Sequence, residues 1–183
     1  MPRKSAKWSI ASCLVTTMLL DARAGLSETT ASTWLGVGAR KIILFGVDQP
    51  QTFHGYRYIL SHLMQSLGVP EADDWRTRLT FVQSKAPNAA SKRDVFRERL
   101  HDLCSDVLYD QDVGPEPWPA FNFAFSETGL DVPHDATHVE NHPAYEVFDP
   151  LEDETVLNPE AYRGPFGDFL DRAWELVGLK RKI

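Results

Sequence analysis

The run Lys41-Ile42-Ile43-Leu44-Phe45-Gly46 decides the fold class, because consecutive apolar residues bounded by Lys and Gly are typical of a buried strand. The turn Val47-Asp48-Gln49-Pro50 follows it directly. Apolar residues then recur at helical spacing from about Gln51 to Leu67, and Gly68 ends that pattern. A buried strand followed by an amphipathic helix is the pattern of a β-α-β unit. We therefore predict an α/β fold with a mainly parallel sheet flanked by helices and with right-handed crossovers.

The same alternation of apolar strand-like runs and helical patterns continues on both sides of this unit. The other predicted strands are Cys13–Leu20, Leu79–Val82 and a short one at Asp106–Tyr109. The other predicted helices are Glu28–Leu35, Ser91–Leu103 and a terminal helix near Pro165–Gly178. Together these elements predict a single α/β domain over residues 13–183, preceded by a polar and basic leader at residues 1–12.

The segment at about residues 110–158 differs from the rest of the domain, because turn residues interrupt every regular pattern in it. The stretch Gly114-Pro115-Glu116-Pro117-Trp118-Pro119 cannot sustain a helix, since each proline fixes its own φ and biases its neighbour toward extended backbone. We predict that this segment is rich in loops. Its aromatic residues alternate with smaller ones, which favours cover for the core and leaves an exposed partner-binding patch as the alternative. These residues are Trp118, Phe121, Phe123 and Phe125.

The composition fits one globular domain and opposes a broad nucleic-acid-binding surface. Of the 183 residues, 43% are hydrophobic and 25% are charged, as in ordinary folded domains. The net charge of −7 argues against a surface that binds phosphates through clustered cations. Cys13 and Cys104 are too few for a disulfide framework, and no segment is long and apolar enough to be predicted to span a membrane.

The N-terminus supports two interpretations. Basic residues precede the apolar stretch Ile10–Leu20, and Ala22-Arg23-Ala24 is similar to a cleavage site, a combination typical of a signal peptide. Asp21 opposes cleavage there, and the same stretch is equally typical of a buried strand behind a polar leader. We therefore expect a cytoplasmic protein, with a secreted or periplasmic protein as the alternative.

One motif predicts chemistry. The pattern predicts a strand that ends in Asp and then a turn that contains Gly, in the stretch Leu19-Leu20-Asp21-Ala22-Arg23-Ala24-Gly25-Leu26. A carboxylate at such a strand end can face a hydrated metal ion beside a phosphate. Asp21 can equally be a strand-end residue that caps the following turn. No G-x-x-x-x-G-K-[ST] loop is present in the sequence, so the element that would hold the phosphates themselves is missing.

These residues, and the order of the elements after them, resemble the C-terminal half of the ParA/MinD-like P-loop ATPases, in which this motif is the Walker B and switch II region. The resemblance covers roughly Cys13 to Asp112 and implies an incomplete P-loop NTPase-like, Rossmann-like architecture. It implies that Asp21 holds Mg²⁺ through water and that the backbone of Ala24 and Gly25 senses the terminal phosphate. It also places Gln83, Asp110 and Asp112 near the nucleotide base, although Gln83 departs from the Asn usual in that family.

The missing phosphate loop limits the function that the resemblance implies. ATP and Mg²⁺ are expected only if a separate phosphate-loop portion completes the site, and we do not expect this chain alone to hydrolyse ATP. The implied partner is a separately encoded N-terminal half or a second copy of the chain. The alternatives are a nucleotide-independent interaction module on the same scaffold, or an exported protein if residues 1–24 are a signal peptide.

Two further groups of residues could carry chemistry. His134, His138 and His142 follow one another at spacings of four and could ligate zinc on a helix, but flanking prolines and the lack of a known zinc motif favour a solvated loop. His101 and Cys104 lie three residues apart on a predicted helix. Without a third partner, this pair indicates packing rather than a thiol nucleophile.

Overall fold

The computed structural model describes residues 17–21, 38–67, 74–109, 132–147, 149, 151 and 158–178. Three strands and three long helices make up most of this part of the chain. In chain order they are β1 (Ile42–Gly46), α2 (Pro50–Leu67), β2 (Leu79–Ala86), α3 (Ala90–Val107), β3 (Thr137–Glu140) and α4 (Pro159–Leu176). Short 3₁₀ helices precede β2 at η2 (Trp75–Arg78) and follow β3 at η3 (Pro143–Tyr145).

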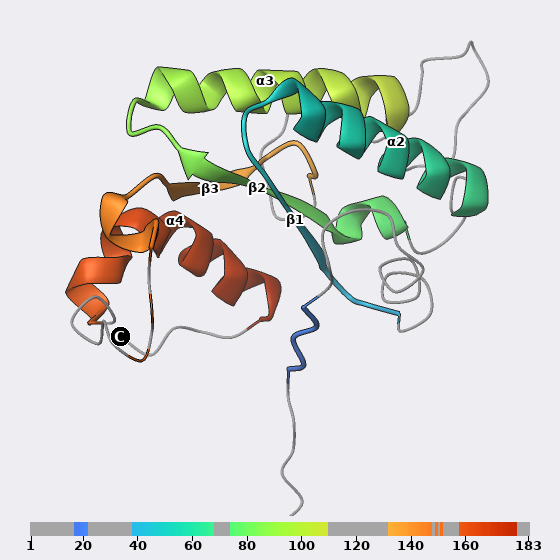
Figure 1. The fold of residues 1–183 in the computed structure, drawn as a ribbon. Coiled ribbons are helices and arrows are strands. Elements are labelled where there is room, and N and C mark those ends of the chain that lie inside the picture. The colour runs from blue at the N-terminus through green and yellow to red at the C-terminus, as the bar shows by residue number, and fades with distance from the viewer. Residues whose placement is uncertain are drawn as a thin grey trace, which may run out of the picture.

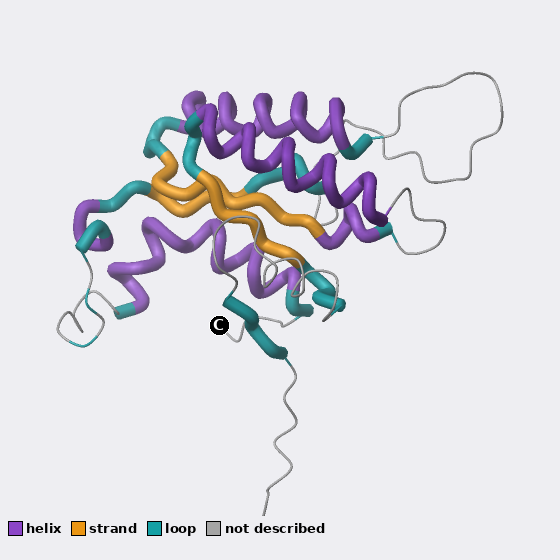
Figure 2. Tube along the Cα trace, turned by 45° about the vertical axis from the view of Figure 1, so that its right-hand side comes forward, coloured by secondary structure: helices purple, strands orange, loops and turns teal. Residues whose placement is uncertain are grey.

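The three strands form one parallel sheet in the order β1-β2-β3. Leu44 pairs in register with Phe81, and Val82 pairs with Thr137. Helices α2 and α3 cover one face of the sheet and α4 covers the other, as the views in Figures 1 and 2 both show. The predicted α/β class with a parallel sheet is therefore confirmed. The arrangement does not establish a P-loop NTPase architecture.

The core lies between the sheet and the pair α2 and α3, because only these helices bury whole apolar stripes. In α2 the buried residues Tyr56, Leu60 and Leu63 recur at helical spacing. Their counterparts in α3 are Phe96, Leu100, Leu103 and Cys104. The face covered by α4 is packed less completely, since Pro165 is the only buried residue that α4 contributes.

The side chains along β1 alternate between these two faces of the sheet. Leu44 is buried beside Tyr56, whose hydroxyl donates to the Leu44 carbonyl over 3.4 Å. Phe45 points the other way, toward α4, where its ring lies 5.3 Å from that of Phe169. Its side chain is still 54% exposed, so α4 covers β1 only in part.

The sequence interpretation was right for the central elements, while two of the predicted strands are not found among the described residues. Residues 17–20 of the predicted strand Cys13–Leu20 belong to no strand, and the side chains of Met18 and Leu19 are 66% and 85% exposed. Its residues 13–16, and the predicted helix Glu28–Leu35, lie outside the described residues. The predicted strand Asp106–Tyr109 is instead the end of α3, because the N–H groups of Leu108 and Tyr109 both donate to the carbonyl of Cys104.

The third strand of the sheet comes from the segment that was predicted to be loop-rich. Thr137–Glu140 pairs with β2 in parallel, so this part of the chain is not the solvated loop that was expected around its histidines. Helix α4 also starts earlier than predicted, because Asn158 caps it by accepting from the N–H of Ala161 over 2.9 Å. Pro159 then occupies the first turn, where its missing N–H costs nothing.

In the part of the chain that the structure describes, no helix combines the length and the apolar character needed to cross a membrane.

Candidate functional site

The carboxyl ends of the parallel strands form the edge at which open α/β sheets bind ligands. Strand β1 ends at Gly46, β2 at Ala86 and β3 at Glu140. The end of β2 is irregular, since the pairing with β3 shifts between Gln83 and Ala86 and Lys85 adopts a φ of 52°. Such a conformation is unusual for a residue with a side chain and marks this edge as locally constrained.

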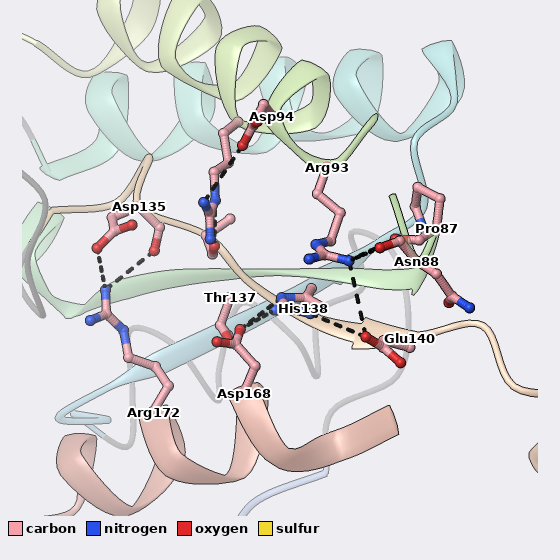
Figure 3. A network of polar contacts seen from close by, with 12 residues as sticks. Pro87, Asn88, Arg93, Asp94, Asp135, Thr137, His138, Glu140, Asp168 and Arg172 are labelled. Carbon is pink, nitrogen blue, oxygen red and sulfur yellow. Dashed lines mark hydrogen bonds and ion pairs between the residues drawn. The ribbon is translucent and has the colours of Figure 1, made fainter. Parts of the chain in front are cut away.

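Asp168 on α4 connects that helix to β3 through one carboxylate oxygen. Its Oδ2 accepts a hydrogen bond from the hydroxyl of Thr137 and another, of 3.0 Å, from the backbone N–H of His138. The same oxygen lies 2.8 Å from Nδ1 of the His138 ring. Figure 3 shows the carboxylate pointing from α4 toward both residues of the strand.

The charge state of Asp168 follows from these contacts. Burial alone would raise its pKa, but the hydrogen bonds from Thr137 and His138, together with the nearby charges of His138 and Arg97, hold the pKa below its usual value. Asp168 is therefore ionised at neutral pH. Its side chain is 47% exposed, so water screens part of this interaction.

His138 continues the network toward the end of β3. Its Nε2 lies 3.9 Å from Oε1 of Glu140, and the His138 side chain is only 15% exposed. Glu140 in turn lies 4.0 Å from the guanidinium of Arg93, at the start of α3. Arg93 also donates to the carbonyls of Pro87 and Asn88 over 3.0 and 2.8 Å, which ties the turn after β2 to the same network.

A second ion pair joins the turn after β1 to α3. The guanidinium of Arg99 lies 2.7 Å from Oδ1 of Asp48, with Asp48 30% exposed. The charged groups at this edge are thus paired with each other: Arg99 with Asp48, and Arg93 with Glu140. Asp168 contacts β3 from its first residue, Thr137, and reaches the same network through His138.

The opposite, amino end of the sheet carries a buried polar cluster. Arg76 in η2 is 1% exposed and forms a paired contact with Asp74, with nitrogen–oxygen distances of 2.6 and 2.9 Å. It also donates to the carbonyl of Leu108 over 2.7 Å. A buried guanidinium needs such partners to offset its lost hydration, so this cluster holds the end of α3 against the start of β2.

His134 and Cys104 belong to the same end of the sheet, around the hydroxyl of Tyr109. The hydroxyl bonds to Nδ1 of His134, whose ring stacks edge-on with that of His101 at 4.9 Å. Burial and the neighbouring His101 lower the pKa of His134, with Asp135 opposing them, so the ring is neutral. Burial raises the pKa of the fully buried Cys104 thiol to about 12. A thiol in that state is no nucleophile, which agrees with the packing role inferred for the pair His101 and Cys104.

The described residues do not assemble the predicted nucleotide site. Asp21 is exposed, and its segment lies near the amino end of β1, away from the carboxyl ends of the strands (Figures 1 and 2). Gln83 is inside β2 rather than at its end and is 3% exposed. Ala24, Gly25, Asp110 and Asp112 lie outside the described residues, so their roles, and those of ATP and Mg²⁺, stay predictions.

The three spaced histidines are not brought together as metal ligands. His134 contacts Tyr109, His138 contacts Asp168, and the ring of His142 accepts from the N–H of Ala144 over 3.3 Å. Across the described ranges, no group of three or more His, Cys, Asp or Glu side chains is arranged to hold a metal ion. The strand at Thr137–Glu140 separates the side chains that a helix would have stacked.

Sequence reasoning missed three residues of the polar network that links α4, β3 and the start of α3, here called the carboxyl-edge network. They are Asp168, Thr137 and Arg93. Asp168 is 30 residues from its partner His138 and sits among ordinary helix positions, so no local pattern distinguishes it. The predicted terminal helix near Pro165–Gly178 already contained Asp168, and the Asn158-Pro159 start signal in the sequence could have given that helix its observed beginning.

Comparisons with protein-family models, with curated proteins and with solved structures each found no match. No relative therefore tests the resemblance to the ParA/MinD-like ATPases.

Proposed function

We propose that this chain is a nucleotide-independent protein-interaction module built on an α/β scaffold. The observation that carries the proposal is the mutual pairing of the charged groups at the carboxyl edge of the sheet. A nucleotide site needs donors directed at phosphates and a carboxylate directed at hydrated Mg²⁺. Here Arg93 and Arg99 are directed at Glu140 and Asp48 instead.

The exposed aromatic side chains support a role in protein contacts. Tyr58 is 67% exposed, Phe45 54% and Trp174 44%. Tyrosine, phenylalanine and tryptophan are enriched in protein interfaces, where they bury large areas at little cost in side-chain entropy. A shallow hollow of about 70 Å³ on α4, between Tyr162, Leu170 and Trp174, is far smaller than ordinary small-molecule pockets of roughly 300 Å³ and more.

Calorimetric titration with Mg-ATP tests the proposal. The purified chain should give no saturable heat at millimolar nucleotide, and its ATP hydrolysis should be no faster than that of an Asp21→Ala variant. Because Asp21 is exposed, the variant should melt like the parent chain, which makes it a matched control. Binding or turnover that Asp21→Ala abolishes would overturn the proposal in favour of a nucleotide-binding protein.

A further inference from the structure

Helix α4 has an outer side that faces away from the sheet. Asp168 and Phe169 contact β3 and β1, so the opposite side of the helix is turned outward (Figures 1 and 2). At 3.6 residues per turn, this side brings six residues together around Gly167. They are Glu160, Arg163, Gly164, Leu170, Asp171 and Trp174, and all except Leu170 are exposed.

The charges on this outer side are symmetric about Gly167. Arg163 lies four residues before it and Asp171 four residues after it, within one continuous helix. In the single chain the guanidinium is 3.8 Å from the carboxylate, beyond hydrogen-bond distance, and both side chains are 53% exposed. If a second copy of α4 packs antiparallel with the two Gly167 residues side by side, Arg163 of each copy faces Asp171 of the other. A carboxylate can accept several donors, so Asp171 can take part in such a contact.

The shapes of the two helices fit in the same register. Leu170 of each copy lies opposite Gly164 of the other, where an added Cβ would meet nothing within 4 Å. Leu170 and Trp174 also line the hollow of about 70 Å³ around Gly167. Glycine inside a helix costs about 1 kcal/mol relative to alanine. No contact among the described residues requires either glycine, whereas close approach of a second helix would.

We propose that the outer side of α4 is the interface of a homodimer, in which two copies of the helix pack antiparallel about a twofold axis at Gly167. A twofold interface uses the same patch on both copies, which is the self-complementarity that Arg163, Gly164, Leu170 and Asp171 provide. A single helix pair buries a small area, so we expect a weak dimer that is monomeric well below its dissociation constant. The inference does not depend on the proposed function, because the carboxyl edge of the sheet takes no part in it.

Two opposite charge reversals, studied apart and then mixed, test this dimer by sedimentation equilibrium. Arg163→Glu alone and Asp171→Arg alone should each raise the dimer dissociation constant by about tenfold, because twofold symmetry puts two pairs of like charges at the interface. An equimolar mixture of the two variants should form heterodimers about as tightly as the parent chain forms homodimers, since both contacts then join opposite charges. Mixing cannot restore an ion pair within either chain, so only contact between copies gives this rescue.

A matched control is Arg57→Glu, which reverses a comparably exposed arginine on α2 and should leave the dimer unchanged. Circular dichroism and a thermal melt check that each variant is folded. Arg163→Gln or Asp171→Asn replaces a reversal that does not fold and should still weaken the dimer. A parent chain that stays monomeric at high concentration would overturn the proposal. So would single reversals that do not weaken the dimer, or a mixture that associates no more tightly than either variant alone.

Discussion

Nδ1 of His138 on β3 lies 2.8 Å from Oδ2 of Asp168 on α4, and the same oxygen accepts the hydroxyl of Thr137 and the N–H of His138. One carboxylate therefore joins the helix to the strand. This contact matters because Pro165 is the only residue that α4 buries fully, and the other apolar side chains of the helix stay partly exposed. Polar contacts carry a larger share of the docking here than they do for α2 and α3.

Replacing Asp168 with Ala should destabilise the fold by about 1–2 kcal/mol, since a hydroxyl and an N–H lose a charged acceptor. The half-exposed carboxylate places the loss toward the low end of that range. Asp171→Ala on the same helix is the control: it removes a 3.8 Å ion pair with Arg163 on the surface and should change stability less than Asp168→Ala does. Urea denaturation of both variants measures the difference, and equal effects would contradict the docking role.

The stability that Asp168 provides should also depend on pH. Its pKa is lowered in the folded chain, so the advantage over Asp168→Ala is present above the unfolded pKa of about 3.9 and is lost as the pH falls through the folded value. The gap between the two urea midpoints should therefore shrink as the pH falls below about 4. A stability difference that grows over that range would contradict a lowered pKa of Asp168 in the folded chain.

Gly46→Ala should destabilise the fold by roughly 1–3 kcal/mol, the usual cost of overpacking. A Cβ at Gly46 would collide with the hydroxyl of Tyr56 and a methyl group of Thr52, where α2 closely approaches the end of β1. Gly55→Ala on the same helix is a matched control, because a Cβ there meets open space. That variant should gain roughly 0.5–1 kcal/mol from helix propensity. Melting temperatures that shift in the same direction for both variants would contradict the close approach of α2 to Gly46.

His134 should make the fold less stable in mild acid. Its pKa is lowered on folding, so below about pH 6.5 the unfolded chain takes up a proton that the folded chain resists, and stability falls as the pH falls. His134→Asn keeps an acceptor for Tyr109 but cannot titrate. The free energy of unfolding, measured in urea at pH 7.5 and pH 5, should fall more for the parent chain than for this variant. Equal losses would show that His134 titrates normally.

Cys104 should resist alkylation in the folded chain. With its pKa raised to about 12, the thiolate fraction at pH 8 is on the order of one in ten thousand, and the thiol is also fully buried. In a Cys13→Ser background, iodoacetamide should label Cys104 at least about a thousandfold more slowly in native buffer than in guanidinium. Rapid labelling of the native chain would instead indicate an accessible thiol.

The sequence predicted the elements whose apolar pattern is long and bounded by clear stop signals. Ile42–Phe45 and the stripe of α2 were found for that reason. The end of α3 was misread because Val107 and Leu108 fit a short strand as well as a final helical turn, and periodicity cannot separate the two over four residues.

The carboxyl-edge network was not predictable in the same way. Strand β3 has only four residues, and its place beside β2 is set by pairing with residues some 55 positions earlier, such as Val82 with Thr137. Asp168 acquires its role only through that placement. Asp21 illustrates the opposite case, because its local motif predicted a strand end whereas the preceding residues are exposed and unpaired with any described strand.

The most direct test of the proposed function is a residue-resolved titration of the ¹⁵N-labelled chain with Mg-ATP. The backbone amides of Gly46, Asn88 and Asn141, which lie at or just beyond the ends of the three strands, report on the edge where a nucleotide would bind. We expect these amide signals to stay unchanged up to millimolar Mg-ATP, because the charged groups around them are paired with each other. Saturable shifts of these three amides would show that the edge binds nucleotide and would contradict the account.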